Sequence, residues 1–85
     1  MTVKDILDIG IAELCEKCQW GALGTETLID YAIRQDGIVV ASGFSKHISE
    51  ELFHRKVTDW YVVADLQDVD TLIVWMDIAE EEQGR

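Results

Sequence analysis

The segment TLIDYAIRQDGIVVASGF, residues 27–44, decides the fold. Its first half has the two-residue period of a β-strand, with one face carrying Thr27, Ile29, Tyr31 and Ile33 and the other Leu28, Asp30, Ala32 and Arg34. Asp36-Gly37 follows, a dipeptide that suits the positive φ angles of a tight two-residue turn. Residues 38–44 return as a second strand. The segment therefore predicts a β-hairpin.

The residues before the hairpin have a helical pattern. Thr2 is suited to cap the first turn, and Asp5 lies three residues on as its capping-box partner. Apolar side chains then recur at three- and four-residue steps, at Val3, Ile6, Leu7, Ile11, Leu14, Cys15 and Cys18. Gly10 interrupts this face, so the segment forms either one bent helix or two short ones, ending near Lys17. Residues 19–26 contain two glycines and predict a loop.

After the hairpin the pattern predicts a short helix and two more strands. Ser49 caps the helix, which runs to about Arg55. Residues 57–64 and 71–78 predict strands joined by a polar turn at 66–70, and the near-continuous apolar character of 71–78 is typical of a central strand. The order α-β-β-α-β-β predicts one α+β domain over residues 1–85. We expect a four-stranded, mainly antiparallel sheet with helices packed on one face, and a frayed acidic tail from about residue 79.

The net charge of the chain limits the kinds of molecule that it can bind. The 85 residues include 17 Asp and Glu against 7 Lys and Arg, a formal net charge of −10. Such a field repels nucleic acid and anionic lipid and attracts basic surfaces, although an acidic excess also serves solubility alone. No apolar run reaches the roughly 20 residues of a membrane span, and Met1 to Asp8 is not a signal-peptide pattern. Two cysteines this close, Cys15 and Cys18, do not make a disulfide scaffold, so we expect a reducing cytoplasm.

The residues that bear chemistry are few. Cys15, Cys18, His47 and His54 are the only cysteines and histidines, and their spacing fits neither a zinc site nor a redox Cys-x-x-Cys that opens a helix. Phosphate-binding glycine loops and hydrolase motifs are absent. A ligand pocket of about 300–1,000 Å³ would consume most of so small a core. The sequence predicts a protein that binds rather than catalyses, without cofactor or metal.

The last third of the chain carries the leading candidate site. Eight acids and no Lys or Arg lie between residues 57 and 84. Five of the acids belong to the final two strands and their turn, where an aromatic side chain at the centre would make a partner-binding surface of Asp59, Tyr61, Asp65, Asp68, Asp70 and Asp77. The alternative interpretation is that Trp60 and Trp75 belong to the core and the acids solvate a turn.

A second candidate site is basic. Lys46, His47, His54, Arg55 and Lys56 lie on and around the second helix, where they could bind a phosphate, a small nucleotide or an acidic partner. The alternative is a solvated helix surface that pairs with neighbouring acids.

Four segments carry a resemblance to a known group of proteins. TVKDILDIG (2–10), the strand-DG-strand hairpin, ISEELFHRKV (48–57) and TLIVWM (71–76) together resemble small accessory proteins of bacteriophages and prophages. CEKCQWGALG (15–24) is not part of that pattern. The resemblance implies a protein of the bacterial host cytoplasm that inhibits a host defence or nucleic-acid-handling complex through an acidic surface, as DNA-mimicking anti-CRISPR proteins do.

The same resemblance leaves two other functions open. One is an oligomeric sponge that sequesters a nucleotide immune signal, and the other is a phage accessory or structural subunit. A homodimer is expected in either case, because a four-stranded sheet leaves two edges and 48% of the residues are apolar.

Overall fold

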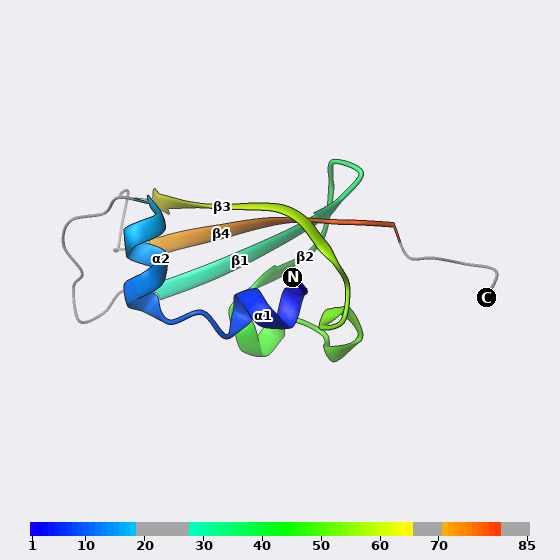
Figure 1. Ribbon diagram of the computed structural model, residues 1–85, viewed down its shortest axis with the longest axis horizontal. Helices are drawn as coiled ribbons and strands as arrows, with labels where there is room; N and C mark the ends of the chain where they lie inside the picture. Colours follow the sequence, from blue (N-terminus) through cyan, green and yellow to red (C-terminus); the bar gives the residue numbers. More distant parts are fainter. Residues whose placement is uncertain (19–27, 66–70, 81–85) are drawn as a thin grey trace.

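The computed structural model describes residues 1–18, 28–65 and 71–80 of the chain (Figure 1). Two short helices come first, α1 (Val3–Leu7) and α2 (Ile11–Cys18). The hairpin strands β1 (Leu28–Gln35) and β2 (Ile38–Gly43) follow, then two 3-10 turns, η1 (Ser45–His47) and η2 (Glu50–Leu52), and finally β3 (Val57–Asp65) and β4 (Thr71–Ile78). All four predicted strands are confirmed. In place of the helix predicted from Ser49 to about Arg55 the structure has the 3-10 turn η2, with Ser49 as its N-cap.

The first helical segment is two helices. Thr2 closes a capping box on α1: its Oγ1 accepts from the Asp5 N–H at 3.4 Å, and its own N–H donates to Asp5 Oδ2 at 2.8 Å. That second hydrogen bond, from the backbone of Thr2, lowers the pKa of the Asp5 carboxyl below its ordinary value. The chain leaves α1 at Asp8, and the Leu14 N–H donates to the Gly10 carbonyl at 3.2 Å as α2 begins. Gly10 therefore separates two helices.

The predicted hairpin is confirmed, turn included. Asp36 and Gly37 have φ angles of 54° and 79°, the pair of left-handed conformations that a two-residue hairpin loop requires. β1 and β2 pair antiparallel, with a bulge where the register shifts between Ile33 and Arg34.

The strand order is β2-β1-β4-β3, which the sequence did not indicate. β4 lies beside both β3, antiparallel, and β1, parallel, so that Tyr31 faces Val74 in the central ladder. The sheet is thus mixed: its two outer ladders are antiparallel and its central ladder is parallel. The central position predicted for residues 71–78 is confirmed.

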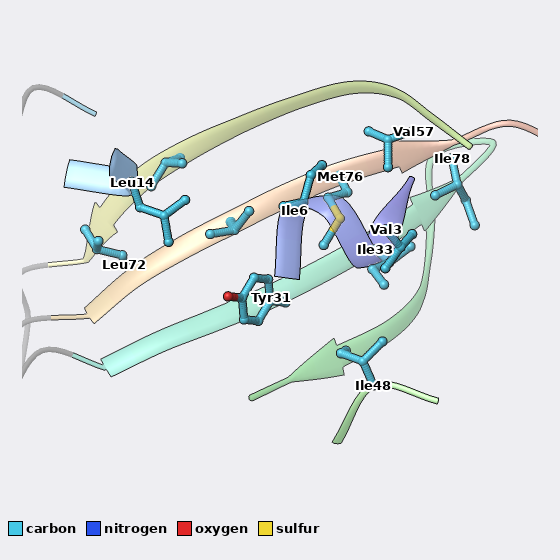
Figure 2. Packing of buried hydrophobic residues seen from close by; sticks show 12 residues of the cluster. Val3, Ile6, Leu14, Tyr31, Ile33, Ile48, Val57, Leu72, Met76 and Ile78 are labelled. Atoms are coloured by element: carbon cyan, nitrogen blue, oxygen red, sulfur yellow. The ribbon is translucent and has the colours of Figure 1, made fainter. Parts of the chain in front are cut away.

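The core lies against one face of the sheet. Along β4 burial alternates strictly, and the buried residues are Leu72, Val74, Met76 and Ile78. Val3 and Ile6 of α1 and Leu14 of α2 are fully buried in the same cluster, and Figure 2 shows the α1 side chains beside the strand residues of the core. These helix and strand side chains form one hydrophobic core.

Some expectations fall outside the described residues: the loop at 19–26, the turn at 66–70 and the tail from 81. Of the two residues before that tail, Ala79 is still tied to the fold, because its N–H donates to the Lys56 carbonyl at 3.0 Å. Within the described chain, no helix is long and apolar enough to cross a membrane.

Candidate protein-binding face

The other face of the sheet, called here the open face, is defined by the strand register. Its residues share a face with Trp75 of β4, and they are Leu28, Asp30, Ala32 and Arg34 of β1, Thr71, Ile73, Trp75 and Asp77 of β4, and Asp59, Tyr61 and Val63 of β3. Ala32 is the single one among them that is buried. Three large apolar side chains on it are substantially exposed, namely Leu28, Tyr61 and Val63. This exposed apolar area makes the open face the candidate contact surface.

Two aromatic rings lie at the centre of the open face. Tyr61 and Trp75 face each other across the β3–β4 ladder and stack, with ring centroids 6.3 Å apart and an interplanar angle of 19°. Tyr61 is 40% exposed, so much of its ring remains available to a partner. Cross-strand aromatic pairs stabilise a sheet, and an exposed one also presents a rigid apolar surface.

Arg34 holds this aromatic pair from the neighbouring strand. Its guanidinium carbon lies 4.9 Å from the Trp75 ring centroid and 5.8 Å from that of Tyr61, within cation–π range of both. The same guanidinium donates to both carboxylate oxygens of Asp77, at 2.8 and 3.2 Å. Hydrogen bonding to Asp77 raises the pKa of Arg34 above its ordinary value. Ring, cation and carboxylate thus form one connected group.

Two carboxylates of the open face, those of Asp77 and Asp59, differ in whether they form an ion pair. Asp77 is paired with Arg34, which removes it from the row of unpaired acids that the sequence predicted. Asp59 is exposed and stands opposite Asp77 in the register, where its Oδ1 accepts from the Trp60 N–H at 3.0 Å. Asp59 therefore brings negative charge to the surface beside Tyr61.

Three of the six predicted partner-binding residues, Asp59, Tyr61 and Asp77, thus lie together on the open face. Asp65 ends β3 opposite Thr71 in the register, while Asp68 and Asp70 lie outside the described residues. Sequence reasoning missed Arg34, because nothing local indicates that β1 lies beside β4.

Two residues of the basic candidate site, Arg55 and Lys56, make contacts that hold the fold together. Arg55 Nη2 donates to the Gln35 side chain at 3.0 Å and to the Ala79 carbonyl. This arginine therefore links the end of β1 to the residue that follows β4, through two uncharged acceptors. The backbone of Lys56 forms an isolated antiparallel β-bridge with that of Thr2.

The remaining basic residues are exposed: Lys46, His47, His54 and Lys56. The His47 ring lies 5.7 Å from that of Phe44. No group of three or more His, Cys, Asp or Glu suited to a metal ion occurs in the part of the chain that the structure describes.

Comparison with known proteins identifies no relative: no family model matches the chain, and neither a curated protein nor a solved structure does. The resemblance to phage accessory proteins therefore stays a prediction.

Proposed function

We propose that this protein is a non-enzymatic binding protein that captures a basic surface of another protein on its open face. The observation that supports this most is the Tyr61–Trp75 stack, which is held by Arg34 and left 40% exposed at Tyr61 beside the carboxylate of Asp59. Tyrosine, tryptophan and arginine are the residues that most often dominate the binding energy of protein interfaces.

The face combines an anchor with a steering charge. Val63 and Ile73 extend the apolar area along the strands from Tyr61 and Trp75. The net charge of −10 would speed encounter with a positively charged partner, since complementary potentials act chiefly on the association rate. Because the cross-strand stack and Arg34 already order the rings, little side-chain entropy is lost on binding.

The partner class that this chemistry favours is a protein whose basic surface ordinarily holds nucleic acid. In the proposed setting the protein is a phage-type inhibitor that occupies such a surface in a host defence or nucleic-acid-handling complex. A nucleotide-sequestering oligomer built on the basic segment is less favoured, because Arg55 is bound to Gln35 and Ala79.

Affinity capture from bacterial host cells followed by mass spectrometry identifies the partner, and variants then test the face. Tyr61→Ala should weaken the partner's affinity by about 30-fold or more, the effect of losing a hot-spot side chain. Asp59→Lys should slow association more than it speeds dissociation. Glu51→Lys, on η2, makes the same charge change away from the sheet and is the matched control.

The proposal fails if Tyr61→Ala and Asp59→Lys bind the captured partner as tightly as the Glu51→Lys control. A thermal-shift screen with cyclic and linear nucleotides tests the sponge alternative, for which stabilisation by a nucleotide is the expected sign.

A further inference from the structure

A groove lies on the opposite side of β3 from the open face. It has a volume of about 720 Å³, is open to solvent, and is called here the α2–β3 groove; its lining residues are Met1, Ile9, Glu13, Glu16, Lys17 and Trp60. Trp60 pairs with the buried Met76, whereas its neighbour Tyr61 pairs with Trp75 on the open face. The groove and the open face are therefore separate surfaces, divided by one strand.

Lys17 occupies the aromatic wall of the groove. Its Nζ lies 4.3 Å from the centroid of the Trp60 ring, well within cation–π range. Glu13 stands four residues before Lys17 on α2, the arrangement in which Glu and Lys pair best on a helix. Yet no ion pair joins them: among the described residues the ion pairs are Lys4–Asp8 and Arg34–Asp77. The Lys17 ammonium group therefore contacts the Trp60 ring and not the Glu13 carboxylate.

Two carboxylates are consequently left along the groove. The side chains of Glu13 and Glu16 are exposed, and neither makes a hydrogen bond or ion pair with any other part of the chain that the structure describes. Met1 and Ile9 add apolar lining beside them. A groove lined by an aromatic ring, apolar side chains and unpaired carboxylates complements a cationic side chain on an apolar stem.

We infer that the α2–β3 groove binds an arginine side chain presented by a segment of a basic protein, and that Lys17 occupies the arginine's place when the groove is empty. An incoming guanidinium stacks on Trp60 and pairs with the carboxylate of Glu16. Lys17 is displaced toward Glu13, one helical turn away. Arginine suits the site better than lysine, because its planar, weakly hydrated head stacks on an indole and pairs bidentately with a carboxylate.

The displacement step makes an unusual prediction: removing a groove residue should improve binding. With Lys17→Gln the Trp60 ring is already free, so affinity for an arginine peptide should rise about two- to fivefold, the equivalent of one exposed cation–π contact. Lys46→Gln removes one positive charge from η1 instead and should change affinity by less than about twofold.

The probe is a blocked Gly-Leu-Arg-Leu-Gly peptide, titrated at low salt while the indole resonances are followed by NMR. Trp60→Phe assigns the Trp60 signal, which should shift, and the Gln analogue of the peptide should leave it in place. Glu13→Gln with Glu16→Gln should abolish most of the binding, whereas Glu50→Gln with Glu51→Gln, on η2, should not. Every substituted side chain other than Trp60 is exposed, so these substitutions should leave the fold intact.

If Lys17→Gln and Lys46→Gln changed the peptide's affinity equally, or if the two Glu double variants did, the inference would be overturned. The peptide would then be attracted by the net negative charge of the protein and not by the groove. A Trp60 resonance that stays unmoved would overturn it as well. Because Tyr61→Ala lies outside the groove, it should leave peptide binding unchanged, so this test and the test of the open face succeed or fail separately.

Discussion

Arg34 and Asp77 are 43 residues apart in the chain and form a two-point ion pair across the parallel strands β1 and β4, with Nε 2.8 Å from Oδ1. The pair binds the two central strands to each other and places the guanidinium over Trp75. It also neutralises an acid that the sequence alone had assigned to a partner. One contact thus links the two central strands and pairs one carboxylate of the open face.

We predict that Arg34 and Asp77 are energetically coupled more strongly than the pair formed by Lys4 and Asp8. The Arg34 and Asp77 side chains are 27% and 37% exposed, against 52% and 62% for Lys4 and Asp8, so water screens the first pair less. Double-mutant cycles with Arg34→Gln and Asp77→Asn, and with Lys4→Gln and Asp8→Asn, measure both couplings from denaturant unfolding. Equal couplings would show that the bidentate geometry adds nothing.

Two isoleucines of the hairpin should differ sharply in their effect on stability. Ile33 is fully buried, so Ile33→Ala should lower the free energy of unfolding by about 2–5 kcal/mol through lost burial and the cavity left behind. Ile38 is 68% exposed, and Ile38→Ala should change it by less than about 0.5 kcal/mol. Urea unfolding of both variants measures the difference; similar losses would contradict the placement of the core.

The capping box predicts one source of acid sensitivity. The folded pKa of Asp5 is lowered by the Thr2 backbone hydrogen bond, so on acidification the unfolded chain takes up this proton first. The stabilisation is present above the unfolded pKa and is lost as pH falls through the folded one. Asp5→Asn should therefore lose less thermal stability than the wild type between neutral pH and about pH 3. Equal losses of thermal stability in Asp5→Asn and in the wild type would contradict the prediction.

The environment of the Tyr31 hydroxyl predicts that the protein loses stability at alkaline pH. Burial, aided by the negative charge of Asp8, raises the pKa of its hydroxyl in the folded protein. Stability from this group is fully present below the unfolded pKa, about 10, and is lost as pH rises through the folded pKa. Tyr31→Phe should unfold less readily in alkali than the wild type. Thermal unfolding measured across the alkaline range tests this, and identical curves for the two proteins would refute it.

The edge strand β2 predicts the mode of self-association. Residues 38–43 carry no charge, and Ile38, Val39 and Val40 are exposed, so two copies can pair there without bringing carboxylates together. A dimer is expected by light scattering at micromolar concentration, and Val40→Lys should shift it to monomer. Val63→Lys, on the opposite edge strand, should leave the dimer intact; a wild-type monomer would contradict the prediction.

Local signals predicted the parts of the structure that depend on neighbouring residues. The Thr2–Asp5 capping box, the Asp36-Gly37 turn and the alternation along residues 71–78 were all readable, because each rests on contacts within a few residues or on a strand's period of two. The separation of α1 from α2 at Gly10 was left open, since a glycine inside a helical pattern allows both a bend and a break.

The sequence by itself determined which segments become strands and which side of each strand can be buried, because backbone sterics and apolar periodicity act over short range. Only the tertiary structure decided that β4 lies between β1 and β3. That choice follows from the packing of the whole core, in which Val74 and Met76 must meet residues of both neighbours and of the helices. That arrangement produces the Arg34–Asp77 pair, the Tyr61–Trp75 stack and the α2–β3 groove. Because these features join segments far apart in the chain, no local sequence pattern predicts them.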